Sequence, residues 1–118
     1  MDTKTVGQEG EERASKYLME NGYCIVERNF RTKYGEIDII VKKAETVVFV
    51  EVKTMPNATS DMLSKVLNTQ KEQRIIKTSK RFLQNHREYS NSYIRYDVIV
   101  LDMQGLPPVY HIENAFSE

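Results

Sequence analysis

The sequence predicts an α/β protein in which a mixed β-sheet is flanked by helices, in the order helix, three strands, helix, two strands. Two observations lead to this prediction. Segments with helical spacing of apolar residues and segments rich in β-branched residues follow one another in that order. One run, Val47–Val50, is apolar without a break, which indicates a strand buried on both faces by covering helices. A chain of 118 residues suits one domain over residues 1–118.

The first predicted element is a helix from Gln8 to Glu20, because Asn21-Gly22 is a typical helix end. At 100° per residue, Glu11 lies on the same side of this helix as Ala14 and Leu18. We therefore expect the Glu11 side chain to project toward the packing face.

The remaining elements follow from apolar runs and turn residues. They are a strand over 23–31, a hairpin over 35–54, a loop over 57–67, a helix over 69–85 with Asn68 or Thr69 as its N-cap, a strand over 93–102, a turn over 105–108 and a short strand over 109–112.

The helix over 69–85 has one apolar face and one basic face. Ile75, Ile76, Phe82 and Leu83 fall within one arc of the helical wheel. The basic face supplies four candidate nucleic-acid contacts, namely Lys71, Arg74, Lys77 and Arg81. An ordinary solvated surface helix has the same pattern, so both interpretations stay open. A net charge of zero argues against a protein that binds nucleic acid by bulk charge alone.

Composition sets further limits. Hydrophobic residues make up 40% and charged residues 29%, as in ordinary globular proteins, and no apolar run is long enough to span a membrane. The N-terminal residues lack the apolar segment of a signal peptide. The single cysteine, Cys24, is expected to be a small buried hydrophobic residue in a strand. We therefore expect a protein of the reducing cytoplasm.

Three charged residues interrupt the apolar hairpin: Asp38, Glu51 and Lys53. A two-residue turn at 43–44 or 44–45 would place Asp38 opposite Phe49 or Glu51, respectively. In both registers Asp38, Glu51 and Lys53 share one face of the sheet, because side chains alternate with period two. Opposed or diagonal positions lie about 4.5–8 Å apart, close enough for two carboxylates to hold one ion.

This arrangement predicts a divalent metal site. Two carboxylates forced together repel, so one takes a proton or a cation binds between them. Oxygen ligands favour Mg²⁺ or Mn²⁺, and no Cys/His cluster suggests zinc. Lys53 can orient or deprotonate a water and stabilise charge on a phosphate, and Glu11 can supply a fourth polar group.

A purely structural interpretation stays open for each residue. Asp38 and Lys53 could form a cross-strand ion pair with Glu51 as a neighbour, and Glu11 could be a helix N-terminal acid favoured by the dipole. The combination favours a site, because a structural pair does not require two acids on one face.

Three features follow one another along the chain: a helix that carries a Glu, then an Asp, and about a dozen residues later Glu-x-Lys on a hairpin. This order resembles the PD-(D/E)xK nuclease core of the restriction-endonuclease-like fold. More closely, the chain resembles the YraN-like family of small bacterial proteins assigned to that fold. The matching segments are GQEGEERASKYL, GYCIVERNFR, GEIDIIV, VVFVEVKT, KEQRIIKTSKRFL, RYDVIVL and HIENAF.

The resemblance implies a site of Asp38, Glu51 and Lys53 with Glu11, similar to that of archaeal Holliday-junction resolvases. It also implies roles toward the substrate for Lys71 and for the segment Arg95-Tyr96-Asp97. One departure is Met55, where the family pattern tends to have an arginine after Val-Lys-Thr.

Two main hypotheses result. In the first, the protein is a Mg²⁺- or Mn²⁺-dependent DNA endonuclease, with branched or structured DNA as one candidate substrate. Asp38, Glu51 and the Val52 carbonyl hold the metal and Lys53 positions the water. Paired symmetric cuts would call for a homodimer. In the second, it is a nucleic-acid-binding module without useful catalysis. A protein whose carboxylates form only ion pairs ranks last.

Overall fold

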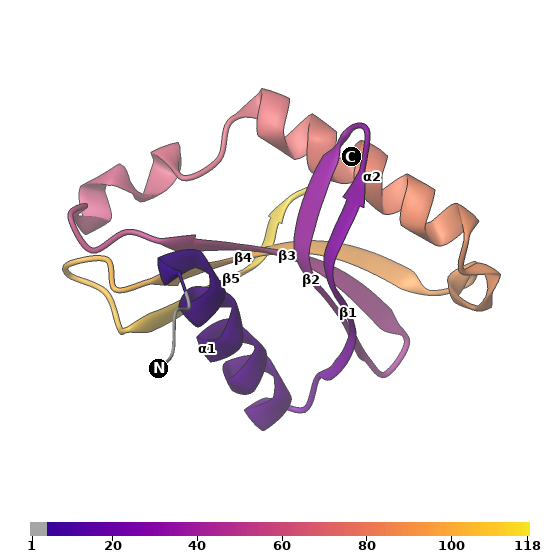
Figure 1. Ribbon diagram of the computed structural model, residues 1–118, viewed down its shortest axis with the longest axis horizontal. Helices are drawn as coiled ribbons and strands as arrows, with labels where there is room; N and C mark the ends of the chain where they lie inside the picture. Colours follow the sequence, from indigo (N-terminus) through magenta and orange to yellow (C-terminus); the bar gives the residue numbers. More distant parts are fainter. Residues whose placement is uncertain (1–4) are drawn as a thin grey trace.

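The computed structural model describes residues 5–118 and has the predicted elements in the predicted order (Figure 1). They are α1 (Val6–Glu20), β1 (Cys24–Thr32), β2 (Gly35–Lys43), β3 (Thr46–Thr54), α2 (Thr69–Gln84), β4 (Tyr93–Leu101) and β5 (Val109–Phe116). Two short 3-10 helices, η1 (Ser60–Lys65) and η2 (Arg87–Tyr89), lie on either side of α2 in the sequence.

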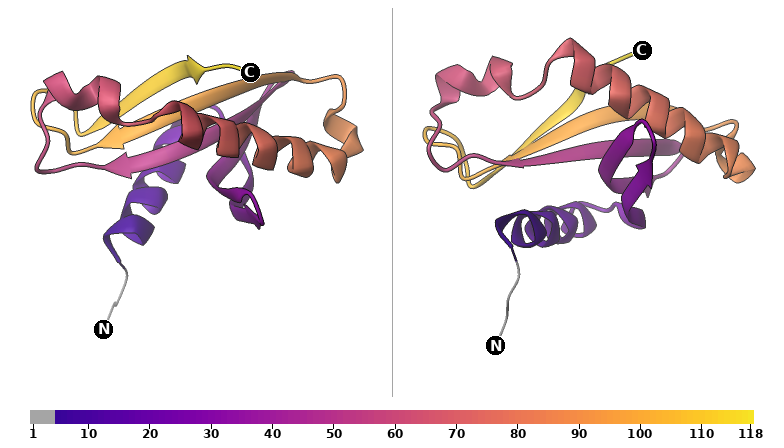
Figure 2. Two further views of the ribbon diagram at one scale, coloured as in Figure 1. Left: turned by 90° about the horizontal axis from the view of Figure 1, so that it is seen from above. Right: turned by 45° about the horizontal axis from the view of Figure 1, so that its top comes forward.

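The strands form one five-stranded sheet in the order β1-β2-β3-β4-β5. Strands β3 and β4 are parallel, and every other neighbouring pair is antiparallel. The parallel pair needs a long crossover, which η1 and α2 provide. The helices α1 and α2 lie on opposite faces of the sheet (Figure 2). The predicted fold class, a mixed sheet flanked by helices, is therefore confirmed.

Strand β3 is buried on both faces, as its unbroken apolar run predicts. Val48 and Val50 pack with Leu18 of α1, whereas Phe49 packs with Phe82 of α2 on the other face. All four residues of the run Val47–Val50 are at most 1% exposed. A polar side chain on the neighbouring part of β3 is consequently held on a rigid strand.

Local signals fix both helices. The Thr5 hydroxyl accepts a hydrogen bond from the Gln8 N–H, and the Gln8 side chain accepts one from the Thr5 N–H, which completes a capping box that begins α1 two residues earlier than expected. The Asn68 side chain accepts the Lys71 N–H at 2.9 Å, so Asn68 is the N-cap of α2. Gly10 allows α1 to approach β3, because a Cβ there would lie 2.7 Å from the Thr54 Oγ1.

Three expectations need correction. The last strand extends to Phe116 rather than ending at residue 112, because β5 pairs with β4 again at Phe116, opposite Tyr96, after an irregularity over 113–115. The segment over 57–67 is not an irregular loop throughout, since η1 lies within it. Cys24 is exposed rather than buried, because it begins the edge strand β1. In the described residues 5–118, no helix has the length and apolar character required to cross a membrane.

Candidate active site

The β2–β3 hairpin brings Asp38 and Glu51 together. Its turn consists of Ala44–Glu45, with Ala44 in the left-handed region at φ 51°. The ladder ends with Ile39 opposite Val50, so the next position places Asp38 opposite Glu51. Of the two registers that the sequence allowed, this is the one with the carboxylates directly opposed.

The Asp38 carboxylate is held by the main chain of β3. Its Oδ2 accepts a hydrogen bond from the Val52 N–H at 2.8 Å. In an extended strand the N–H and C=O of one residue point to the same side. The Val52 carbonyl is therefore directed toward β2, the strand that carries Asp38. This geometry brings the carboxylate of Asp38 and the peptide oxygen of Val52 to the same side of β3.

The carboxyl group of Glu51 lies close to that of Asp38. Burial is the main reason why the pKa of Glu51 is raised to about 9, and the neighbouring carboxyl group of Asp38 adds to it. Lys53 and Lys71 oppose this rise without cancelling it. At neutral pH Glu51 therefore keeps its proton beside Asp38.

Two lysines stand beside this pair. Lys53 lies two residues beyond Glu51 on β3, hence on the same face, beneath α2. Lys71, in the first turn of α2, has its pKa lowered mainly by its close approach to Lys53 and by the charge of Lys53. In the structure α2 brings Lys71 close to the carboxylate pair. The sequence alone did not place it there, because the loop before α2 had no predicted geometry.

Glu11 lies at the edge of the site. Its side chain is 16% exposed, and its carboxylate is 3.8 Å from the guanidinium of Arg28 on β1. Burial raises the pKa of Glu11, followed by the charge of Asp38, and a hydrogen bond with the Asn29 side chain acts in the opposite direction. Glu11 therefore interacts electrostatically with Asp38, as its expected inward direction allowed, while its nearest polar partners belong to β1.

The donor set suits a small divalent cation. Glu51 holds a proton beside Asp38, and a cation that binds between the two carboxyl groups can replace that proton. The set consists of two carboxylates and the Val52 carbonyl. Within residues 5–118 no three His, Cys, Asp or Glu side chains converge as a metal cluster, so water or substrate oxygens would have to complete the coordination.

The hairpin does not form the cross-strand ion pair between Asp38 and Lys53 that was the alternative interpretation. In the described part of the chain, Lys53 makes no ion pair with Asp38, whose Oδ2 instead accepts the Val52 N–H. Asp38 faces another acid. The arrangement keeps two carboxyl groups together at a cost, which is typical of functional sites.

The basic face of α2 is exposed, as predicted, and the four candidate residues lie at different distances from the carboxylates. Lys71 is nearest, and the side chain of Arg74 lies against Gly35 at the start of β2. Lys77 and Arg81 lie farther along the helix, beside Tyr34 in the β1–β2 turn. The sequence predicted these cations but not the turn they face.

Met55 follows the site strand and packs against the hydrophobic cluster of Ala58, Val66 and Met103. Here this chain has an apolar residue where the family pattern tends to have an arginine. The position contributes to the packing of the crossover and not to the charge of the site.

A second buried polar cluster surrounds Asp97, which is completely buried. Arg95 donates two hydrogen bonds to its carboxylate, at 2.9 and 2.8 Å. His111 Nε2 lies 2.7 Å from Oδ2, and the Asn114 N–H donates to Oδ1 at 3.0 Å. Burial alone would raise the pKa of Asp97, but these hydrogen bonds outweigh it and lower the pKa. Both oxygens of the Asp97 carboxylate are therefore paired within the protein.

This Asp97 cluster lies on the other face of the sheet from Glu51 and Lys53. Neighbouring side chains in a strand point to opposite faces of the sheet. Tyr96 packs under α2, so Asp97 points to the side of α1. Tyr17 of α1 contacts the His111 ring nitrogen at 3.2 Å. The cluster ties β4 and β5 to α1, and it does not adjoin the carboxylate pair as the segment Arg95-Tyr96-Asp97 could have done.

Replacing Asp97 with Asn is expected to destabilise the protein by about 3 kcal/mol, because it leaves Arg95 without its buried counter-charge. Asp102→Asn is the matched control, since the Arg13–Asp102 pair is 40% exposed on both sides and should change stability by less than about 1 kcal/mol. Urea unfolding of both variants measures the difference. Equal effects would show that the Asp97 cluster adds no more than a surface pair.

Comparison with known proteins gives a consistent result. The family described as "Uncharacterised protein family UPF0102" matches residues 10–101. A UPF0102 protein of Treponema denticola is 40% identical over 125 residues, covering 97% of this chain and 96% of the relative. A UPF0102 protein of Methylobacillus flagellatus is 34% identical over 114 residues, covering 97% and 98%. The similarity extends over nearly the whole chain and is not confined to the site.

Proposed function

The chain belongs to the UPF0102 family, which confirms the YraN-like resemblance of its motifs, and on this premise we propose that it is a metal-dependent DNA endonuclease. The observation that carries the proposal is the half-buried Asp38–Glu51 pair of the β2–β3 hairpin, which lies beside Lys53 and Lys71. A fold gains nothing in stability from two half-buried acids side by side. A divalent cation would offset the two carboxylates, and a phosphate between the two ammonium groups would reduce their repulsion.

Asp38 and Glu51 are the metal-holding residues in this proposal, with the carbonyl of Val52 as a third oxygen donor. The hydrogen bond from the Val52 N–H fixes the Asp38 carboxylate, so little reorganisation is needed for binding. A bound Mg²⁺ or Mn²⁺ supplies Lewis acidity toward a phosphodiester and lowers the pKa of a water ligand.

Lys53 orients the attacking water and stabilises the negative charge that develops on the phosphate. Lys71 stabilises the charge of the same phosphate from α2. Its pKa is lowered because its ammonium group lies close to that of Lys53. A phosphate group between the two lysines would relieve their repulsion. Glu11 acts through its charge on Asp38 rather than by direct contact with Glu51.

Arg74, Lys77 and Arg81 continue the positive surface of Lys71 along α2, and we assign to them contacts with the DNA backbone. Such contacts position a substrate without reading its sequence. If the substrate is a four-way junction, symmetric cuts require two copies of the protein, and a homodimer is then part of the proposal.

The test is cleavage of a DNA panel by purified protein with Mg²⁺ or Mn²⁺. Labelled linear duplex, single-stranded, flapped and four-way-junction DNA are incubated with the wild-type protein, Asp38→Asn and Glu45→Gln. Glu45 lies in the exposed β2–β3 turn and serves as the carboxylate control. We expect cleavage by the wild type and Glu45→Gln and none by Asp38→Asn. Equal cleavage by all three would assign the activity to a contaminant and reject the proposal.

A non-catalytic nucleic-acid-binding module is the second candidate. The observation that favours it is the extent of the basic surface, which continues along α2 well beyond the carboxylate pair. Salt-sensitive DNA binding with no cleavage on any substrate or metal would select the module.

A further inference from the structure

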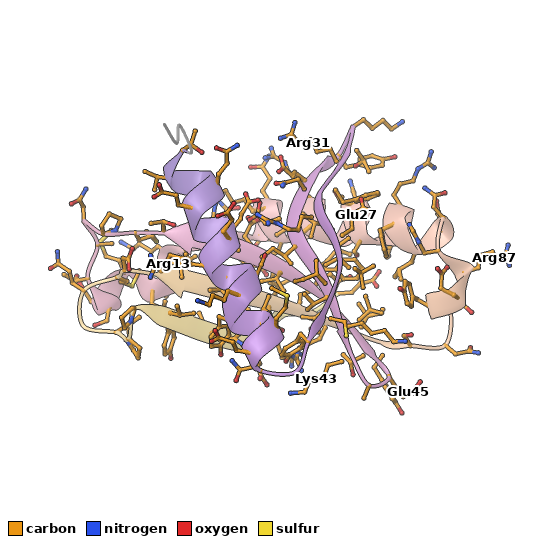
Figure 3. The ribbon with its side chains drawn as sticks, turned by 60° about the horizontal axis from the view of Figure 1, so that its bottom comes forward. Arg13, Glu27, Arg31, Lys43, Glu45 and Arg87 are labelled. Carbon is orange, nitrogen blue, oxygen red and sulfur yellow. The ribbon has the colours of Figure 1, made fainter. Side chains whose placement is uncertain are left out.

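A groove lies between the β1–β2 turn and the C-terminal half of α2. Two adjoining cavities of about 430 and 330 Å³ form it, and both are lined by Tyr34 and Arg81. We call it the hairpin groove. In Figure 3, Arg31 marks the β1–β2 turn beside it, at the opposite end of the β2 strand from Lys43 and Glu45.

The hairpin groove is strongly positive. Its lining includes five cationic residues, which are Arg31, Lys33, Lys77, Lys80 and Arg81. Among the described residues, no acidic side chain lines it. Arg31 pairs with Glu36 at 3.0 Å, and Lys80 pairs with Glu118. Within residues 5–118, Lys33, Lys77 and Arg81 have no carboxylate at ion-pair distance. Three cations thus remain available to an anionic ligand.

Tyr34 presents an aromatic ring among these cations. The side chain is 43% exposed, and the ammonium groups of Lys33 and Lys77 lie 5.3 and 5.9 Å from its ring centroid. Aromatic rings surrounded by Lys and Arg are typical of single-strand nucleic-acid sites, where a base stacks and the cations follow the phosphates.

The turn that carries Tyr34 is held in place. Phe30 packs edge-on against Phe82 of α2, with ring centroids 5.3 Å apart. Gly35 lies against Arg74 and Thr78 of α2, and the Tyr34 N–H donates to the Thr32 Oγ1 at 3.1 Å. The ring is therefore positioned before a ligand arrives, which lowers the entropic cost of binding.

The hairpin groove and the candidate active site lie along the same helix, α2. Lys71 stands at the carboxylate pair, and Lys77 stands at Tyr34, six residues along the same helix. At 1.5 Å per residue this is about 9 Å along the axis. Arg74 lies between them against the start of β2. One strand could thus contact both Tyr34 and the carboxylates within a few nucleotides.

We propose that the hairpin groove binds an unpaired stretch of the DNA substrate, with one base stacked on Tyr34 and its phosphates facing Lys77 and Arg81. The proposal rests on the proposed function, and it names the substrate class as DNA with a single-stranded segment next to the cleavage site. In a continuous duplex each base is covered by its neighbours, so only an unpaired base has a free face for this ring.

The test is binding, measured without chemistry. Fluorescence anisotropy with a labelled 15-mer of deoxythymidine and a 15-base-pair duplex is recorded in EDTA for the wild type, Tyr34→Ala, Tyr34→Phe and Tyr93→Ala. Tyr93 is the matched control, because it is 73% exposed at the start of β4. We expect Tyr34→Ala to weaken single-strand binding about 5- to 100-fold and duplex binding less than about 2-fold. Tyr34→Phe and Tyr93→Ala should bind as the wild type does.

Wild-type affinity of Tyr34→Ala for the single strand, or an equal loss on the duplex, overturns the proposal. Tighter binding of a uridine 15-mer than of the deoxythymidine 15-mer overturns the assignment to DNA. Because no metal is present, the result does not depend on cleavage. Loss of single-strand binding in Tyr34→Ala upholds the groove even if the Mg²⁺ panel shows no cutting, in which case the endonuclease proposal alone fails.

Discussion

Lys53→Met is expected to lower the cleavage rate by about 10²- to 10³-fold while leaving divalent-cation binding close to that of the wild type. Methionine keeps the apolar length of the side chain and removes the ammonium group. In the proposed mechanism Lys53 acts on the water and on the phosphate, whereas the cation is held by Asp38 and Glu51. The loss should therefore appear in single-turnover cleavage at saturating Mn²⁺.

Lys16→Met is the control for this prediction, since Lys16 is exposed on α1 and the variant should cleave at the wild-type rate. Lys71→Met separates the two lysines, because a residue that mainly holds the substrate should raise KM more than it lowers kcat. Cleavage by Lys53→Met at the wild-type rate would remove Lys53 from the mechanism.

In metal-free buffer the protein is expected to lose stability as the pH rises from about 5 to about 9. The pKa of Glu51 is raised from 4.5 to about 9, so the folded state holds one proton more than the unfolded state throughout that window. The free energy of unfolding must then decrease as the pH increases. One pKa unit corresponds to about 1.4 kcal/mol, and since Glu51 is not fully removed from water we expect a total loss of roughly 1 to 3 kcal/mol.

Urea unfolding at several pH values measures this loss, and two variants identify its cause. Glu51→Gln cannot titrate at this position, so most of the decrease should disappear, and only the smaller contribution of Glu11, whose pKa burial also raises, should remain. The variant should exceed the wild type in stability at pH 8. Asp38→Asn should reduce the decrease without abolishing it, because burial is the largest cause of the raised pKa of Glu51. Asp97 does not contribute to the decrease between pH 5 and pH 9. Its pKa is lowered in the folded state, so the stability that its ionised form provides is lost only as the pH falls below 3.8. A decrease unchanged in Glu51→Gln would place the titrating group elsewhere.

Most of the fold was predictable because the sequence patterns are local. The run Val47–Val50 is buried on both faces, and Asn68 caps α2, as their sequence neighbours indicated. Asp38 and Glu51 could be placed on one face because a hairpin with a short turn allows few registers. The sequence left two registers open, since Ala44–Glu45 lacks the Asn-Gly signal of a tight turn.

What the sequence did not predict depends on contacts between distant segments. Lys71 reaches Lys53 only because the crossover through η1 sets where α2 begins. Tyr34 faces Lys77 for a similar reason, although the basic and aromatic letters around it, RTKYG, were a usable signal. The environment of Asp97 needed the long final strand β5, whose His111 and Asn114 residues complete its hydrogen bonds. A strand predicted to end at residue 112 could not supply the second of these.

The central claim is that Glu51 holds a proton beside Asp38 and that a divalent cation replaces this proton. Isothermal titration of Mn²⁺ into the protein at pH 7, in two buffers of different ionisation enthalpy, counts the protons released on binding. The account predicts one bound Mn²⁺ per chain with release of about one proton, and it predicts little binding by Glu51→Gln. Binding without proton release, or equal binding by Glu51→Gln, would contradict it.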